Sequence, residues 1–256
     1  MLTAFVGCFA PKGEVKSDGK GADNAEEIRS DEQIGVNNVL FIMKYVQGGK
    51  CKIGGPSNAQ STTVNSFYMG ETEVTQQLWI AVMGKNPSWF KDGQLDFHWG
   101  KEDNMFRPVE KVSWEDCQEF IKKLNELTGK NFRLPTYAEW EYAAKGGRKG
   151  KNTRYAGSDD INAVAWYDRN SGWSEITEKT TISLRTQEVA QKEPNELGLY
   201  DMTGNVREWV QERQDNMAVT RGGGFHSSPA DCEVWKNQVS RTYGDSDIGF
   251  RLVMTE

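Results

Sequence analysis

The stretch from Phe132 to Gly147 reads FRLPTYAEWEYAAKGG and contains a well-marked helix start. Thr136 lies three residues before Glu139, which is the spacing of a capping box, where hydroxyl and carboxylate each bond a backbone N–H. Pro135 fits a rigid entry turn before the cap. We therefore expect a short helix here, with Trp140, Ala143 and Ala144 facing inward and a stop at Gly146-Gly147.

Two more helices are expected upstream of this stretch. Ser113 and Asp116 repeat the capping pattern, and Gly129 would end the helix that follows. Its apolar positions are Cys117, Phe120, Ile121, Leu124 and Leu127. The segment from Gln76 to Met83 also has helical apolar spacing and is closed by Gly84.

Short apolar runs near the start predict strands. Val39–Met43 is typical of a buried strand, and Gly48-Gly49 would turn the chain into Lys50–Ile53 as the second strand of a hairpin. Ser66–Met69 indicates another strand. After Gly150 helical periodicity is lost, and Gly, Asn, Asp and aromatic residues alternate irregularly. The pattern predicts one loop-rich α+β domain over residues 36–256, low in regular secondary structure.

Composition narrows the classes of partner. The 256 residues are 37% hydrophobic, yet they include nine Trp, eight Tyr and eleven Phe, which suits an irregular domain held together by aromatic packing. The formal net charge is −6, and the sequence shows no Lys/Arg run or basic stripe. Nucleic acid is therefore not an expected partner.

Cysteine and histidine are sparse. None of the four cysteines forms a C-x-x-C pair, which excludes a zinc ribbon and a thioredoxin-type motif and leaves disulfide pairing open. His98 and His226, the two histidines, are too few for a helical His-rich metal site. The cysteines are Cys8, Cys51, Cys117 and Cys232.

Residues 1–35 are expected to be a leader remnant and a flexible tether. The apolar stretch Met1–Phe9 is far shorter than the ~20 residues of a membrane-spanning helix. Phe5–Cys8 loosely resembles a bacterial lipobox, whose cysteine is lipidated after cleavage. This reading predicts an extracytoplasmic protein, periplasmic or surface-anchored, with membrane contact only through Cys8. The alternative is a frayed start with a free thiol.

Taken in order, many short segments resemble the formylglycine-generating-enzyme (sulfatase-modifying factor) family. The resemblance runs from about residue 37 to the C-terminus and implies that family's variant of the C-type lectin fold. The matching segments are Phe67–Gly70, Glu73–Thr75, Leu78-Trp79, Asn86–Ser88, Arg107–Glu110, Val112–Trp114, Phe132–Thr136, Glu139–Ala144, Asn195–Met202, Gly204–Val206, Glu208-Trp209, Arg221–Phe225 and Gly249–Arg251.

The resemblance also implies a copper site that this chain lacks in part. Active members oxidise a sulfatase cysteine with copper held by two thiolates five residues apart, and those positions fall on Ser227 and Cys232. A serine hydroxyl cannot replace a thiolate on Cu(I). His226 lies beside the position, but imidazole plus one thiolate is not the family's arrangement. Copper is therefore not expected, and Cys232 would be a buried hydrophobe unless the chain is an oxidase.

A second enzymatic branch with this fold uses non-haem iron held by a His-x-x-x-His-x-Glu cluster. The sequence contains no such cluster.

Calcium is the cofactor that the resemblance supports, in a structural role. The ligands would be the carboxylates of Asp201 and Glu208 with the carbonyls of Gly204 and Val206, an oxygen set that calcium prefers. The alternative is that Asp201 caps a turn and Glu208 is an ion-pair partner. A second family calcium loop would fall near residues 163–166, where Val164 replaces the liganding residue, so no site is expected there.

The remaining motifs of the resemblance are expected to be scaffold. Arg133, Glu139, Trp140, Glu141 and Arg251 would form buried ion pairs and aromatic packing.

Three functions remain open. The first is a non-catalytic binding module for a glycan or a protein, with Trp235 and Tyr243 as stacking platforms for a glycan. The second is a copper-dependent formylglycine-generating oxidase. The third is a variable protein of a diversity-generating retroelement, with residues 233–237 in the hypervariable stretch. The expected binding face comprises His226, Ser227, Asp231, Trp235, Lys236, Asn237 and Tyr243.

Overall fold

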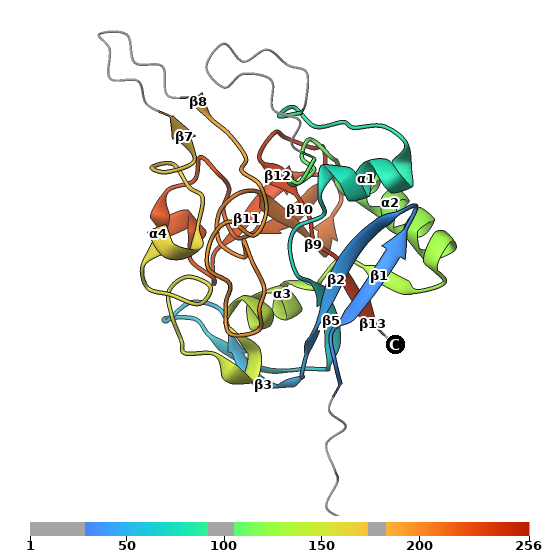
Figure 1. Cartoon of the computed structure of the whole chain (residues 1–256). Helices are drawn as coiled ribbons and strands as arrows, with labels where there is room; N and C mark the ends of the chain where they lie inside the picture. Colours follow the sequence, from blue (N-terminus) through green and yellow to red (C-terminus); the bar gives the residue numbers. More distant parts are fainter. Residues whose placement is uncertain (1–28, 92–104, 174–182, 256) are drawn as a thin grey trace, which may run out of the picture.

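The computed structural model describes residues 29–91, 105–173 and 183–255. One sheet has the strand order β1-β2-β5-β13-β6, so the last strand lies between two earlier ones. Figure 1 shows β13 next to β5. All of its pairs are antiparallel. The strands are β1 (Glu32–Val36), β2 (Val39–Val46), β5 (Phe67–Gly70), β13 (Val253–Thr255) and β6 (Asn131–Arg133).

Helices α1 (Gln76–Met83) and α2 (Trp114–Thr128) pack on this sheet and on each other. Both begin and end as the sequence predicts. Ser113 and Asp116 complete a reciprocal capping box, and Gly84 and Gly129 adopt left-handed conformations at the C-caps. Aromatic packing joins the two helices, since the Trp79 and Phe120 rings stack at 5.1 Å.

The second half of the chain forms a sheet with the order β11-β10-β9-β12. Its strands are β9 (Arg207–Gln214), β10 (Met217–Arg221), β11 (Asn237–Arg241) and β12 (Ile248–Gly249). Helix α3 (Tyr137–Ala144) contacts β9 and β10, and its Trp140 is fully buried there. The remaining described elements are short: η1 (Gly147–Lys149), α4 (Ile161–Val164), β7 (Gly172–Trp173), β8 (Ser183–Leu184) and η2 (Pro229–Cys232).

The expected hairpin between Val39–Met43 and Lys50–Ile53 is wrong. β3 (Gly49–Ile53) pairs with β4 (Gln60–Val64) in a separate two-stranded sheet, while β2 pairs with β1 and β5. Gly48 does turn the chain, but it packs against the backbone of residues 64–66 and directs the chain away from β2. A local turn signal cannot specify which distant strand completes a pair.

Two other expectations need correction. The first strand begins at Glu32, ahead of the expected domain start at residue 36. β2 is also not buried on both faces, because Leu40 is 66% and Ile42 38% exposed while Met43 is fully buried. The mixed α+β architecture itself is confirmed. Within the part of the chain that the structure describes, no helix is long and apolar enough to cross a membrane.

Candidate functional site

Ser227, at the first expected copper position, is a structural residue of a tight turn. Its Oγ accepts a hydrogen bond from the Gly224 N–H at 2.9 Å, and its own N–H donates to the Gly224 carbonyl at 2.9 Å. The residue is only 8% exposed. The hydroxyl thus stabilises the loop after β10 and is not open to a ligand.

Cys232, at the second expected copper position, is a core residue. Its thiol is fully buried among Tyr155, Ile161, Val164, Ala165 and Tyr167. Burial raises the pKa of Cys232 to about 12, helped by the charges of Asp231 and Asp168. A neutral, enclosed thiol beside a serine does not fit Cu(I), which needs thiolate donors.

The carboxylate of Glu208, on β9, forms a buried ion pair. Arg251 donates to both of its oxygens at 2.7 Å, and the Trp140 Nε1–H donates to Oε2 at 2.7 Å. Arg251 also donates to the carbonyls of Gly70 and Tyr200. The pair therefore connects the two sheets through a desolvated, hydrogen-bonded contact, which is the scaffold role expected of Arg251.

Asp201 and Glu73 lie close enough to this pair to affect its charge balance. Asp201 Oδ2 accepts from the Ala190 N–H at 2.7 Å, while Oδ1 and both oxygens of Glu73 are buried without a hydrogen-bond partner. Burial, opposed by Arg251 and reinforced by Glu208, raises the pKa of Asp201 to about 6. Burial and the Asp201 charge raise the pKa of Glu73 well above its usual range.

In this arrangement only part of the expected calcium ligand set is free. Asp201 Oδ1 is a free buried acceptor, and Gly204 and Val206 lie in the same buried loop. Glu208, however, already neutralises Arg251, and a cation beside the guanidinium would be repelled. Among the described residues, no group of three or more His, Cys, Asp and Glu side chains is placed to hold a metal ion.

The expected polar binding face is divided. His226 is exposed and lies 3.5 Å from the buried carboxylate of Asp247, which Arg207 already holds in a bidentate pair. Asp231 is exposed in η2, where it accepts from the Ser228 hydroxyl at 2.6 Å. Lys236 and Asn237 are exposed at the start of β11.

The two expected stacking aromatics do not form one platform. Trp235 is half-buried and packs on the second core cluster, with its ring close to Gly55. Tyr243 is 63% exposed and follows the opposite end of β11. A strand rises about 3.3 Å per residue, so the five residues of β11, roughly 15 Å long, separate the two side chains.

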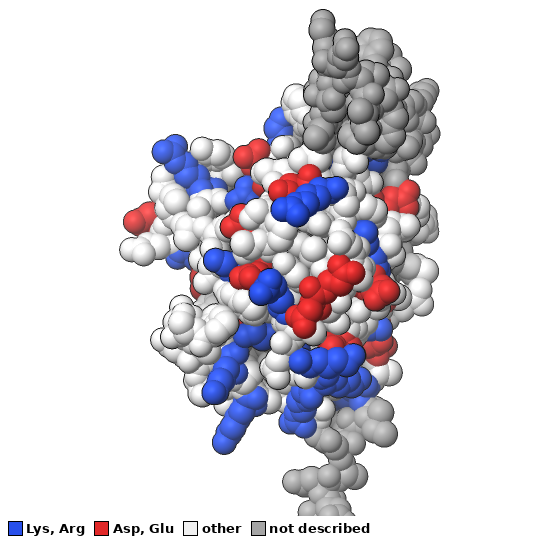
Figure 2. Space-filling model, turned by 90° about the vertical axis from the view of Figure 1, so that its left-hand side faces the viewer, with Lys and Arg blue, Asp and Glu red and all other residues white. Residues whose placement is uncertain are grey.

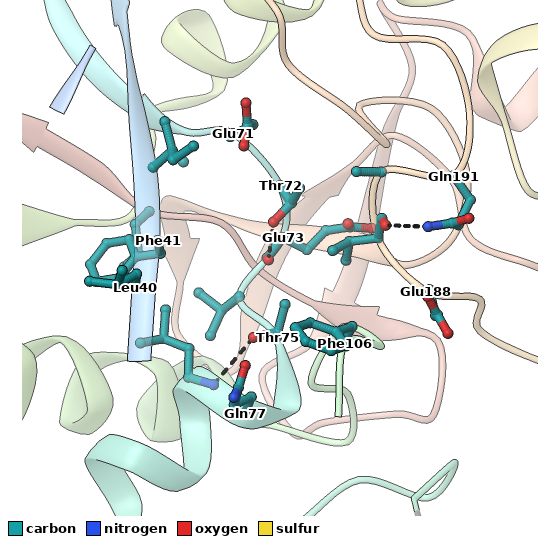
Figure 3. Close-up of a pocket in the computed structure, with 17 residues that line it drawn as sticks. Leu40, Phe41, Glu71, Thr72, Glu73, Thr75, Gln77, Phe106, Glu188 and Gln191 are labelled. Carbon is teal, nitrogen blue, oxygen red and sulfur yellow. Dashed lines mark hydrogen bonds between the residues drawn. The ribbon is translucent and has the colours of Figure 1, made fainter. Parts of the chain in front are cut away.

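An open pocket of about 360 Å³ lies elsewhere, between β2, the β5–α1 connection and residues 188–191 (Figure 3). Leu40, Ile42 and Phe106 line it with large exposed apolar side chains. Figure 3 shows the Glu73 side chain extending from the β5–α1 connection toward residues 188–191. The pocket thus combines an accessible apolar rim with a buried acid at its base.

Sequence reasoning missed this pocket. Leu40 and Ile42 were expected inside a buried strand, and Phe106 carried no motif. In the structure, exposure alternates along residues 39–43. The sequence does not reveal this alternation, because an unbroken apolar run is equally typical of a strand buried on both faces.

A family model described as a sulfatase-modifying factor enzyme 1-like domain matches residues 29–256. The chain belongs to this family. The match also begins ahead of the domain boundary expected at residue 36. The resemblance read from the motifs is thereby confirmed, together with the fold that it implies.

Three relatives show the range of the family around this chain. The chaperone protein LppX of Paenibacillus barcinonensis is 35% identical over 82% of this chain and 88% of that protein. The inactive C-alpha-formylglycine-generating enzyme 2 of Bos taurus is 27% identical over 59% of this chain and about half, 52%, of that protein. The solved structure of Treponema denticola variable protein 1 superposes with a TM-score of 0.75 and 31% identity, covering 88% of this chain and 99% of that one.

Proposed function

We propose that this chain is a non-catalytic, extracytoplasmic member of the family that binds a protein ligand. The observation that supports the loss of catalysis is the turn at Ser227, where a hydrogen-bonded hydroxyl replaces a copper thiolate. The buried Cys232 supports it further, since a thiol with a pKa of about 12 supplies no thiolate at neutral pH.

The pocket supports the choice of a protein as the ligand. Leu40, Ile42 and Phe106 leave a concentrated apolar rim in water, and such a patch is typical of an interaction site. We infer that an extended apolar segment of another protein covers it. The similarity to a protein named as a chaperone agrees with such a ligand. A glycan is less favoured because Trp235 and Tyr243 are separated along β11.

The test measures whether the protein slows the aggregation of reduced insulin. Reduced insulin chains expose apolar segments and are a standard chaperone substrate. We expect the wild type to slow it and Leu40→Ser/Ile42→Ser to lose most of this effect. Leu127→Ser/Val239→Ser is the matched control, since both residues are exposed apolar side chains outside the pocket. Equal activity of both variants, or binding on a glycan array with no effect on insulin, would contradict the proposal.

The oxidase alternative makes a separate prediction. A formylglycine-generating oxidase converts the cysteine of a Cys-x-Pro-x-Arg peptide to the aldehyde, with a characteristic loss of mass. We expect no conversion by the wild type supplied with copper and oxygen. Conversion would restore the oxidase reading, and Ser227→Cys against Ser228→Cys would show whether the missing thiol is the reason for inactivity.

The likeness to a variable protein favours one further candidate function. Residues 233–237 lead into the edge strand β11, and because Lys236 and Asn237 are exposed, substitutions at these two positions would not disturb the core. A retroelement-diversified binding protein would carry a near-duplicate of the coding sequence for residues 226–243 beside a reverse transcriptase gene. Absence of that duplicate from the surrounding genome would remove this candidate.

The extracytoplasmic location rests on Cys8, which lies outside the described residues, as does His98. Its lipobox-like setting supports lipidation. Mass spectrometry of the purified protein tests this directly, because an acylated Cys8 adds the mass of its lipid chains. An unmodified N-terminal peptide from the native host would contradict it.

A further inference from the structure

Basic side chains gather at one end of an otherwise acidic protein. Figure 2 shows Lys and Arg along the lower part of the face it presents, the end where Figure 1 places β3. We call this set of exposed residues the basic end. It comprises Lys50 and Lys52 on β3, Arg148 and Lys149 on η1, and Lys151.

Hydrogen bonds donated by basic side chains hold these segments together. The Arg148 Nε–H donates to the Gly48 carbonyl at 2.7 Å, at the entrance to β3. Lys145, at the end of α3, donates to the Lys52 carbonyl at 3.1 Å and to the Glu141 carboxylate at 2.5 Å. Residues about 100 positions apart in the sequence therefore form one surface.

One face of the β3–β4 hairpin is suited to phosphate groups. Lys50 pairs with Thr63 and Lys52 with Ser61, and alternation places all four exposed side chains on the same face. These residues line a shallow hollow on the hairpin. Ammonium groups next to hydroxyl donors can neutralise and hydrogen-bond phosphate oxygens at the same time.

Acids among the described residues help to locate this charge. Lys151 lies 3.6 Å from Glu196, which is only 10% exposed. Partial burial raises the pKa of Asp31, but the hydrogen bonds from Lys44 and Tyr45 and the charges of Lys44 and Lys149 lower it overall. The charge of Lys149, on η1, therefore acts on Asp31, just ahead of β1.

We propose that the basic end docks on an anionic lipid surface, with Lys50, Lys52 and the hairpin hydroxyls contacting headgroup phosphates. A net charge of −6 repels the remainder of the protein from such a surface, so docking would impose one orientation. Residue 29 at this end leads back in the sequence toward Cys8. The docking itself requires neither lipidation nor the ligand-binding function.

The test uses the full chain with Cys8→Ser, so that no acyl group contributes. It measures co-sedimentation with phosphatidylglycerol vesicles and with phosphatidylcholine vesicles at low ionic strength. We expect binding to the anionic vesicles alone, lost in 1 M salt, where the Debye length falls to about 3 Å. Each surface Lys contributes about five-fold to such partitioning, so Lys50→Gln/Lys52→Gln should weaken it by more than ten-fold.

Lys122→Gln/Lys123→Gln is the matched control, because it removes the same charge from α2. It should bind anionic vesicles like the wild type, and circular dichroism confirms that every variant is folded. Absence of wild-type binding, or equal loss in the control, would overturn the proposal. So would equally strong binding to heparin or duplex DNA in solution, which would indicate a general polyanion surface.

Discussion

At position 232 the thiol is enclosed by two tyrosines and three aliphatic side chains, and it is fully buried. Reaction with iodoacetamide requires both contact and the thiolate. We expect Cys232 and the buried Cys117 to remain unmodified in the native protein at pH 8, and both to react in concentrated urea. Peptide mass spectrometry measures the modified fraction. The half-buried Cys51 serves as the internal comparison, and native labelling of Cys232 at the unfolded rate would contradict its burial.

The Arg251–Glu208 pair is the most enclosed ion pair linking the two sheets, with side chains 0% and 1% exposed. Replacing Arg251 by Leu leaves an uncompensated buried carboxylate and two carbonyls without their donor. We expect a loss of about 3–5 kcal/mol in the free energy of unfolding, measured with urea. Arg213→Leu is the matched control. It removes a partly exposed pair with Glu115 and should cost under about 1 kcal/mol.

Glu110 links stability to pH. One of its oxygens accepts from the Phe90 N–H at 2.8 Å, the other has no partner, and burial raises its pKa from 4.5 to about 7. The folded state therefore binds the proton more tightly than the unfolded state. Its contribution to stability is fully present below pH 4.5 and is lost as the pH rises through 7.

Glu110→Gln should remove that loss. Between pH 4.5 and 8, we expect the unfolding free energy of the variant to rise relative to wild type by up to about 3 kcal/mol. Urea unfolding at both pH values measures the difference. Glu126→Gln, exposed on α2, is the control and should track the wild type. A Glu110→Gln curve parallel to wild type would show that this carboxyl titrates normally.

At the scale of single elements, α2 depends on a local signal that sequence already reveals. The Ser113 hydroxyl accepts from the Asp116 N–H, and the Asp116 carboxylate accepts from the Ser113 N–H at 2.9 Å. Ser113→Ala should lower the unfolding free energy by about 1 kcal/mol, whereas Ser113→Asn retains a capping acceptor and should lose much less. Thermal and urea unfolding measure both. Equal losses would mean that packing, not the cap, is what Ser113 contributes.

At the scale of the whole molecule, the two sheets are held by Arg251 where a calcium ion was expected. A calcium site with millimolar or tighter affinity would stabilise the folded state by mass action. The free energy of unfolding would rise by about 2.7 kcal/mol when calcium is in hundred-fold excess over Kd. Because Glu208 is already paired, we expect the same unfolding midpoint in excess calcium and in EDTA. A rise of several degrees with calcium and none with magnesium would restore the calcium reading.

The distance along the chain over which each sequence signal acts determines how much of the structure the sequence could predict. The caps at Ser113 and Thr136 and the closing glycines act within one helical turn, and those helices begin and end as expected. The partner of β3 and the exposure of Leu40 depend on strands far away in the chain, and both were misjudged. The expected binding face is divided for the same reason, because Trp235 and Tyr243 flank opposite ends of β11.

The sequence by itself determined the family, the α+β fold and the helix boundaries, and it predicted the loss of the copper thiol pair. These depend on residue identity and on local spacing, both visible in one dimension. Only the tertiary structure decided that Cys232 is enclosed, that Arg251 neutralises Glu208, and that η1 lies against the start of β3. Burial and charge balance depend on which distant groups surround a side chain, and folding alone brings those groups together.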